Sequence, residues 1–201
     1  MGNKIMKHYK LTEETIEYNG RTLHRIECIE DFKYAKKGEK GGWIEKESNL
    51  SDNAWVSGNA KVYGDAKVSG NAKVSGNAWV SDNAKVSGNA KVSGNAWVSD
   101  NAWVSGNAWV SGNAEVSGDA EVSGDAKIDD SRNYCVFQSF GRGNRWTTAF
   151  KQKDGSIMIV CGCFRGTIDE FVSKVKETHG DNQFGKEYMA IVDVIKIRFG
   201  V

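Results

Sequence analysis

The sequence has little of several features that would assign it to a common class of protein. No apolar run approaches the roughly 18 residues of a membrane span, and the N-terminal MGNKIMKHYK lacks the hydrophobic core of an export signal. Lysine and arginine number 27 and aspartate and glutamate 26, so the formal net charge is +1. We therefore expect a cytoplasmic protein with no membrane partner. A long nucleic acid is not expected either, because such binders usually carry a marked basic excess.

Histidine and cysteine are scarce. The three histidines are His8, His24 and His179, and the four cysteines are Cys28, Cys135, Cys161 and Cys163. Only the Cys161-Gly-Cys163 spacing invites a metal or redox function, since on one strand both thiols would face the same way. No second cysteine pair or histidine cluster completes a tetrahedral ligand set. We expect no metal and no cofactor, and we expect reduced, buried, structural thiols.

A six-residue repeat dominates the middle of the chain. From Ser51 to Ile128 the pattern Ser-Gly/Asp-Asn/Asp-Ala-x-Val occurs thirteen times without insertion, with Tyr63 once in place of serine. Steps of six further upstream reach Leu50 and Ile44, so fifteen aliphatic positions share one frame. A period of six fits neither an α-helix nor a long alternating strand. It is typical of short strands broken by turns.

Each repeat predicts one minimal strand and one turn. In the strand, Ala54 and Val56 share the inward face and Trp55 points outward, because successive side chains alternate. Ser-Gly-Asn forms the turn, since glycine adopts positive φ freely and Asn or Asp tolerates it. Turn chemistry also explains the repeat aspartates better than a calcium site does. Three repeats make a triangular coil, and fifteen make five coils about 24 Å tall.

The segment Val56-Ser57-Gly58-Asn59-Ala60-Lys61 resembles the hexapeptide-repeat family. The resemblance implies a left-handed parallel β-helix, although serine stands where that family most often has glycine. A right-handed β-helix and a pentapeptide solenoid are the alternatives. Because each coil pairs with the next, both ends of such a stack need caps.

The flanking segments are expected to supply these caps, which gives a mainly β fold in three parts. Residues 1–41 form an N-terminal cap, with a type I′ hairpin turn at Asn19-Gly20. Residues 42–128 form the solenoid. Residues 129–201 form a small α+β domain with strands in NYCVFQSF, RWTTAFKQ and IMIVCGCF. Its helix TIDEFVSKVKETHG starts with a Thr167/Glu170 capping box, and a second helical stretch over 186–192 precedes a last strand, VIKIRF.

The variable position of the repeat records the character of the outer surface. Variable residues that lie eighteen positions apart fall on the same face, which gives three faces. The first carries Trp43, Lys61, Trp79, Trp97 and Glu115; the second Asn49, Lys67, Lys85, Trp103 and Glu121; the third Trp55, Lys73, Lys91, Trp109 and Lys127. Trp97, Trp103 and Trp109 thus encircle one coil, one on each face. Either the terminal segments fold back over some of these indoles, or the indoles meet a partner.

Two kinds of partner are expected at these faces. One is a second copy of the chain, with a closed trimer favoured because solenoids of this family often pack that way. The other is a small anionic or nucleotide-like ligand that stacks on an indole while lysine meets phosphate. The candidate residues for either interface are Trp79, Trp97, Trp103, Trp109, Lys61, Lys85, Lys91, Arg142 and Arg145.

An enzyme is the less favoured interpretation. Acyltransferases that share the hexapeptide repeat use a histidine base near the solenoid, and zinc enzymes with this fold need three histidines. The repeat block contains none. The segments GGWIEKESNLSDNAWVSGNA and TTAFKQKDGSIMIVCGCFRGTIDEF resemble repeat proteins of phages and prophages. That resemblance implies a sponge for host immune signalling nucleotides. A structural scaffold is the second interpretation and an acyltransferase the third.

Overall fold

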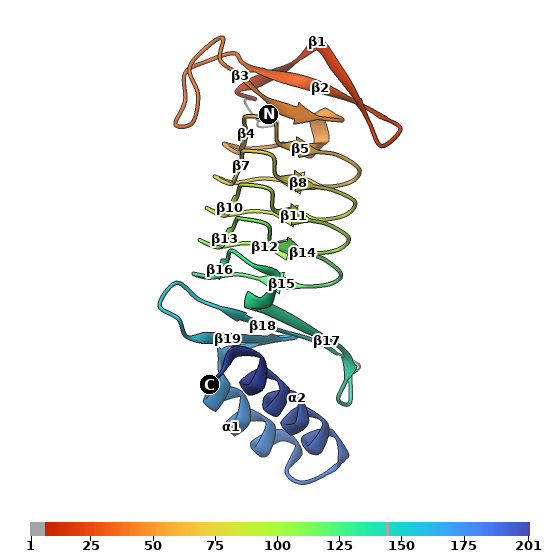
Figure 1. Ribbon diagram of the computed structural model, residues 1–201, viewed down its shortest axis with the longest axis vertical. Coiled ribbons are helices and arrows are strands. Elements are labelled where there is room, and N and C mark those ends of the chain that lie inside the picture. The colour runs from red at the N-terminus through yellow and green to blue at the C-terminus, as the bar shows by residue number, and fades with distance from the viewer. Residues whose placement is uncertain (1–6, 144) are drawn as a thin grey trace, which may run out of the picture.

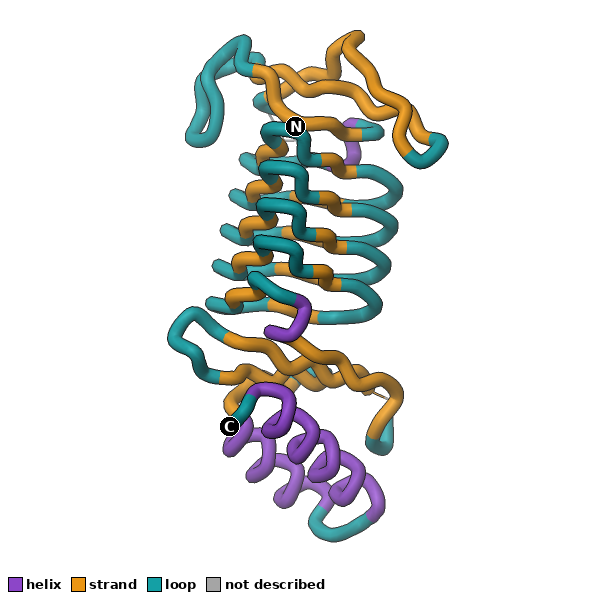
Figure 2. Tube along the Cα trace, in the orientation of Figure 1, coloured by secondary structure: helices purple, strands orange, loops and turns teal. Residues whose placement is uncertain are grey.

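The computed structural model describes residues 7–143 and 145–201. Residues 1–6 of the predicted N-terminal cap and Asn144 of the GRGN turn lie outside this description. The molecule is a rod of stacked coils, with an antiparallel sheet at one end and a sheet with two helices at the other (Figure 1). Short strands alternate with turns along the rod (Figure 2).

The coils repeat every eighteen residues, as the sequence predicts. Trp55 pairs with Lys73, Lys73 with Lys91, Lys91 with Trp109 and Trp109 with Lys127, all in parallel. The strands are β3 (Lys40–Ile44), β4 (Trp55–Val56), β5 (Lys61–Val62), β6 (Lys67–Val68), β7 (Lys73–Val74), β8 (Trp79–Val80), β9 (Lys85–Val86), β10 (Lys91–Val92), β11 (Trp97–Val98), β12 (Trp103–Val104), β13 (Trp109–Val110), β14 (Glu115–Val116), β15 (Glu121–Val122) and β16 (Lys127–Ile128).

Three parallel sheets form the faces of the rod, and their composition confirms the predicted sorting. The first face is β3-β5-β8-β11-β14, the second β6-β9-β12-β15 and the third β4-β7-β10-β13-β16. Leu50 extends the second face through an isolated bridge to Val68. Five coils are therefore stacked, and each face carries the variable residues assigned to it with one exception. Asn49 lies in a short 3-10 helix and is buried, and its amide nitrogen donates to the carbonyls of Gly64 and Ala66.

Valine and alanine fill the interior. The repeat alanines from Ala54 to Ala126 and the fifteen aliphatic residues from Ile44 to Ile128 are all at most 3% exposed. Full burial of one valine side chain contributes about 1.5 kcal/mol or more. The inward pair therefore supplies the packing energy of each repeat.

The turns explain two more positions of the repeat. The glycine position has positive φ, +67° at Gly58, and Asp82 adopts +58° where it replaces glycine. The asparagine position forms a ladder of side-chain hydrogen bonds between coils, in which each amide nitrogen donates to the oxygen eighteen residues further on. One ladder joins Asn53, Asn71, Asn89 and Asn107 at 3.3, 3.2 and 3.1 Å. The near-constant asparagine therefore has a role between coils as well as within its own turn.

An antiparallel hairpin caps the N-terminal end. Strands β1 (Tyr9–Tyr18) and β2 (Arg21–Cys28) meet at Asn19 and Gly20, whose φ values of +50° and +71° fit the predicted type I′ turn. β2 continues the first face by pairing with β3. Ile26 is fully buried in the solenoid core, and the short 3-10 helix η1 (Glu47–Asn49) completes this end.

A four-stranded antiparallel sheet caps the other end. After the 3-10 helix η2 (Ser131–Asn133) come β17 (Tyr134–Phe140), β18 (Arg145–Lys151), β19 (Ile157–Cys161) and β20 (Phe164–Thr167), paired in that order. Phe150 and Val160 join the solenoid core from one side of the sheet. Ala149 and Ile159 pack with the helices on the other side. The sheet thus lies between the last coil and the helices.

The helices confirm one prediction and correct another. α1 (Ile168–His179) begins at the Thr167/Glu170 capping box and is followed by Gly180, as predicted. The predicted last strand VIKIRF is wrong: α2 runs without a break over Gln183–Phe199. Tyr188, Ile191, Val192 and Ile195 are buried along one side of it, and this helical spacing outweighs the strand propensity of the β-branched residues. Neither helix has the length and apolarity needed to cross a membrane within the described residues.

The third predicted strand is also corrected. IMIVCGCF divides into β19 and the start of β20, because Gly162 turns the chain with a φ of +60°. The sheet therefore has four strands, and the fourth is β20 rather than the predicted VIKIRF.

Two glycines with the same φ provide a test of coil stacking. Gly112 and Gly124 have φ values of +63° and +66°, but a Cβ at Gly112 would lie 2.5 Å from the Asp129 carbonyl oxygen, and a Cβ at Gly124 would meet nothing within 4 Å. We expect Gly124→Ala to lower the free energy of unfolding by about 1 kcal/mol, the cost of positive φ. Gly112→Ala should cost about 2 kcal/mol or more, as measured by urea denaturation. Equal losses would contradict the close approach.

Candidate functional site

Three exposed indoles encircle one coil. Trp97, Trp103 and Trp109 lie on β11, β12 and β13, one on each face, and are 36%, 46% and 42% exposed. Each indole N–H donates to a serine hydroxyl of the preceding coil, at 3.3, 3.2 and 3.1 Å respectively. The acceptors are Ser81, Ser87 and Ser93. These bonds fix the rings against the faces of the rod, so they present preorganised apolar surface.

A lysine lies beside the exposed indole on two of the faces. Lys85 pairs with Trp103 on the adjacent strand of the second face, and Lys91 pairs with Trp109 on the adjacent strand of the third face. Both lysines are exposed, and neither has an ion-pair partner within residues 7–143 and 145–201. Each of these faces therefore combines a fixed aromatic ring with a cation that is available to an anion.

The first face differs because the hairpin reaches over it. The Lys61 ammonium lies 4.9 Å from the Tyr18 ring centroid and 5.8 Å from that of Trp79, and burial lowers the pKa of Lys61. Trp79 also contacts Tyr18 and Trp97 edge-on, at 5.4 and 5.8 Å between ring centroids. Lys61 and Trp79 thus belong to the packing of the N-terminal cap more than to an open surface.

The N-terminal segment covers two further outward tryptophans. Trp43 is 9% exposed, with the Arg25 guanidinium 4.8 Å from its ring centroid. Trp55 is 1% exposed and packs edge-on against Phe32, 5.5 Å between centroids. Their side chains lie at outward positions of the coil but are buried by residues from outside the repeat. Of the six outward tryptophans of the solenoid, only the encircling three remain open.

Arg142 and Arg145 lie apart from the solenoid candidates. They line a cavity of about 740 Å³ beside the C-terminal helices, together with Phe171, Lys174 and Tyr188. The structure therefore does not join these arginines to the Trp–Lys faces. Lys174 and Tyr188 were not predicted from the sequence, since only the folding of α1 and α2 against the sheet brings them near Arg142 and Arg145.

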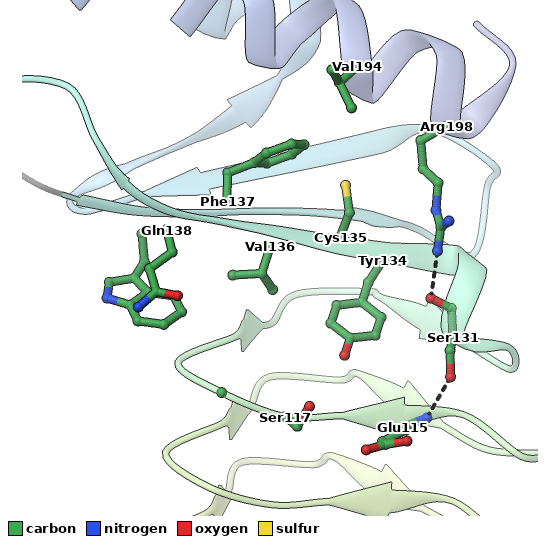
Figure 3. A pocket seen from close by; sticks show the side chains of 12 residues that line it. Glu115, Ser117, Ser131, Tyr134, Cys135, Val136, Phe137, Gln138, Val194 and Arg198 are labelled. Atoms are coloured by element: carbon green, nitrogen blue, oxygen red, sulfur yellow. Dashed lines mark hydrogen bonds between the residues drawn. The ribbon is translucent and has the colours of Figure 1, made fainter. Parts of the chain in front are cut away.

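A second cavity, of about 690 Å³, lies where the last coil meets β17 and α2 (Figure 3). Tyr134 and Val136 point toward the coils, and Cys135 and Phe137 point toward α2 (Figure 3). Arg198 donates to the Ser131 carbonyl at 3.1 Å, and the Ser131 hydroxyl accepts from the backbone N–H of Glu115 at 3.1 Å (Figure 3). The polar groups that line this cavity thus hydrogen-bond to one another across the junction. This indicates that the cavity belongs to the packing interface between the solenoid and its C-terminal cap.

The thiols do not form the pair that one continuous strand would give. Cys161 ends β19 and is buried, with the Thr147 hydroxyl 3.2 Å from its sulfur, but Cys163 is exposed beyond the turn at Gly162. The expectation of a buried, structural role is therefore wrong for Cys163, and Cys135 is only partly buried. Within the described ranges, no group of three or more His, Cys, Asp and Glu side chains is placed to hold a metal ion.

The comparisons with known proteins agree with the coil architecture. The YdcK β-solenoid repeat family matches residues 90–106, which include the strands of Lys91, Trp97 and Trp103. No curated protein matches the chain. The stacked coils and this match make the chain a β-solenoid repeat protein.

Trp55 and Trp103 both occupy the outward position of the repeat, and their substitution tests the difference in burial between them. We expect Trp55→Ala to lower the free energy of unfolding by about 3 kcal/mol or more, because the ring is almost fully buried. Trp103→Ala should cost less than about 1 kcal/mol at protein concentrations where the chain is monomeric, since its ring is largely exposed in one copy. Urea denaturation of the two variants measures the difference. A loss of less than about 1 kcal/mol for Trp55→Ala would show that the N-terminal segment does not cover Trp55 in solution.

Thiol labelling tests the placement of the cysteines. We expect Cys163 of the folded protein to react with iodoacetamide first at pH 8, because it is exposed. Burial raises the pKa of Cys135 to about 11, so its labelling rate should continue to increase up to that pH. Mass spectrometry of digested samples identifies the modified residue, and Cys163→Ser serves as the control. Fast labelling of Cys161 in the folded chain would contradict the burial described here.

Proposed function

We propose that this protein is a non-catalytic β-solenoid that associates side by side into a closed oligomer. It sequesters a small anionic, nucleotide-like ligand at the seams, which are the interfaces between faces of neighbouring copies. The observation that carries the proposal is the ring of fixed, exposed indoles at Trp97, Trp103 and Trp109. Indoles held this way gain burial on association without losing much side-chain freedom.

The ring favours parallel packing of rods. Because the three tryptophans belong to one coil, they lie at one height along the axis. In a trimer about an axis parallel to the rods, one face of each subunit meets a different face of the next, and the contact closes after three copies. Such packing puts indoles of neighbouring copies at the same level. The hairpin and the C-terminal sheet cover the ends of the stack, which disfavours growth into a fibre.

The second and third faces are the pair best suited to a ligand. Where the second face of one copy meets the third face of another, the seam combines Trp103 and Lys85 with Trp109 and Lys91. A base can stack between or upon the indoles while the ammonium groups neutralise phosphate. Lys61 and Trp79 are packed under Tyr18 on the first face, so they lie outside this interface.

The placement of the histidines supports binding without catalysis. His8 stacks on Phe32 at 4.8 Å between centroids, and His24 lies with Nδ1 3.2 Å from the Thr12 carbonyl oxygen. His179 stacks on Tyr188 in the C-terminal part. No histidine of the chain is therefore located on an open Trp–Lys face, where a general base for acyl transfer would act.

The biological role we propose is that of a sponge for signalling nucleotides, which the resemblance to phage and prophage repeat proteins supports. A rigid structural scaffold is the second candidate. Its support is the continuous asparagine ladder and the two end caps, which suit a spacer of fixed length.

Sedimentation of variants tests the assembly. We expect the native protein to sediment as a trimer, and Trp103→Ala combined with Trp109→Ala to shift it toward monomer, because both sides of each seam lose their indole. Lys67→Ala is the matched control, since Lys67 is an exposed residue of the second face two coils from Trp103. A double variant that remains fully trimeric would overturn the role of these rings.

A thermal-shift screen with cyclic and linear nucleotides tests the ligand. A nucleotide present at about 100 times its Kd should add about 2.7 kcal/mol of stability and raise the melting temperature. Lys85→Ala combined with Lys91→Ala should abolish the rise, and the nucleotide should be recovered intact. An oligomer that no nucleotide stabilises would leave the scaffold as the function. Turnover of acetyl-CoA would instead support an acyltransferase.

A further inference from the structure

A cavity in the C-terminal part has the features of a separate small-molecule site. It measures about 740 Å³ and is lined by the β19–β20 turn, by α1 from Phe171 onward, by the start of α2, and by Arg142, Gly143 and Arg145. Pockets of roughly 300 to 1,000 Å³ suit ligands of drug or nucleotide size. This cavity does not involve the repeat, and it is complete within one copy of the chain.

The charge of its lining is one-sided. Arg142, Arg145 and Lys174 line the cavity, and no aspartate or glutamate does. The whole chain is nearly balanced, with 27 basic and 26 acidic residues, so this group of cations is a local departure. Lys174 pairs with Glu177 on its own helix at 2.9 Å, and both side chains are more than half exposed. Within the part of the chain that the structure describes, neither arginine forms an ion pair.

Aromatic rings form the apolar part of the lining. Phe171 meets Tyr188 edge-on at 5.6 Å between centroids and Phe164 at 5.2 Å. His179 stacks on Tyr188 with an angle of 29° between the rings. These contacts hold the rings in place, so a flat apolar group can pack against them without reordering the cavity.

The backbone leaves room for one of the cations. A Cβ at Gly162 would lie 1.9 Å from Nη1 of Arg145, so the guanidinium passes directly over this glycine. Tyr188 also lines the cavity and is buried, and this burial raises the pKa of its hydroxyl to about 12, so the hydroxyl stays protonated. It lies 3.4 Å from the Phe140 carbonyl oxygen as a donor. The cavity thus combines a positioned guanidinium with a neutral aromatic wall.

We propose that this cavity binds a small organic anion that carries an aromatic or heteroaromatic ring. The acid group lies near Arg145, Arg142 and Lys174, and the ring packs against Phe164 and Phe171. A guanidinium binds carboxylate or phosphate through two parallel hydrogen bonds, which suits either acid. The site goes beyond the proposed function of the solenoid faces, because it requires neither the indole ring nor an oligomer.

Isothermal titration calorimetry of the full chain with phenyl phosphate and with adenosine 5′-monophosphate tests the proposal. We expect saturable binding of at least one of them, and we expect benzyl alcohol, which has the ring without the acid, not to bind. Arg145→Gln and Lys174→Gln should each weaken binding about tenfold. Lys176→Gln is the matched control, because Lys176 is exposed on the same helix but does not line the cavity.

The result is independent of the seam. Trp103→Ala combined with Trp109→Ala should leave the affinity for the bound probe unchanged, which separates this site from the solenoid faces. Phe164→Leu provides a second test, since it keeps an apolar side chain but removes the ring, and it should weaken binding several-fold. Absence of binding of both probes up to about 5 mM would overturn the proposal. So would equal affinities for the native chain, Arg145→Gln and Lys174→Gln.

Discussion

The coils take their strand hydrogen bonds from neighbours in the stack. The backbone N–H of Trp97 donates to the Ala114 carbonyl at 2.9 Å, and the backbone N–H of Trp79 donates to the Ala96 carbonyl at 2.9 Å. Adjacent coils must therefore keep the same length of eighteen residues. A single inserted residue would move the inward valine to the outside. It would also break the backbone hydrogen bonds between strands and the asparagine side-chain ladder in that coil. The uninterrupted repeat, the narrow Val/Ala interior and the two antiparallel end caps all follow from this constraint.

The same constraint separates the residues that build the rod from those that give it a surface. Alanine and valine are confined to the interior, glycine or aspartate to the positive-φ turn, and asparagine to the side-chain ladder. The position between alanine and valine is free of these requirements, and it is the one that varies in chemical type along the repeat. The lysines and tryptophans at this position therefore determine which partners the rod can bind. Because the rod is triangular, these side chains lie on three faces that cannot contact one another within one chain.

That division determines which interactions are available to the protein. The faces near the hairpin are covered by the protein's own N-terminal segment, through Tyr18 over Lys61 and Phe32 against Trp55. The coil of Trp97, Trp103 and Trp109 lies beyond the reach of the hairpin and stays open. A shared site for these rings requires a second copy, whereas the cavity beside α1 and α2 is assembled by the C-terminal part alone. The two proposed sites differ for this physical reason, and they are separable by variants.

The sequence by itself determined the repeat architecture, because a strict period of six with one inward pair permits only short strands in eighteen-residue coils. It also determined the hairpin turn at Asn19-Gly20 and the start of α1, which depend on local chemistry at a few neighbouring residues. Only the tertiary structure decided that Trp43 and Trp55 are buried, that Val194–Phe199 is helical and that Cys163 is exposed. It also decided that Arg145 joins Lys174 and Tyr188 rather than the solenoid lysines. The burial of Trp43 and Trp55 and the position of Arg145 depend on packing between segments far apart in the chain, which leaves no periodic or local signal in the sequence. For α2 the helical spacing of the buried residues is present in the sequence, but the β-branched residues of VIKIRF obscure it.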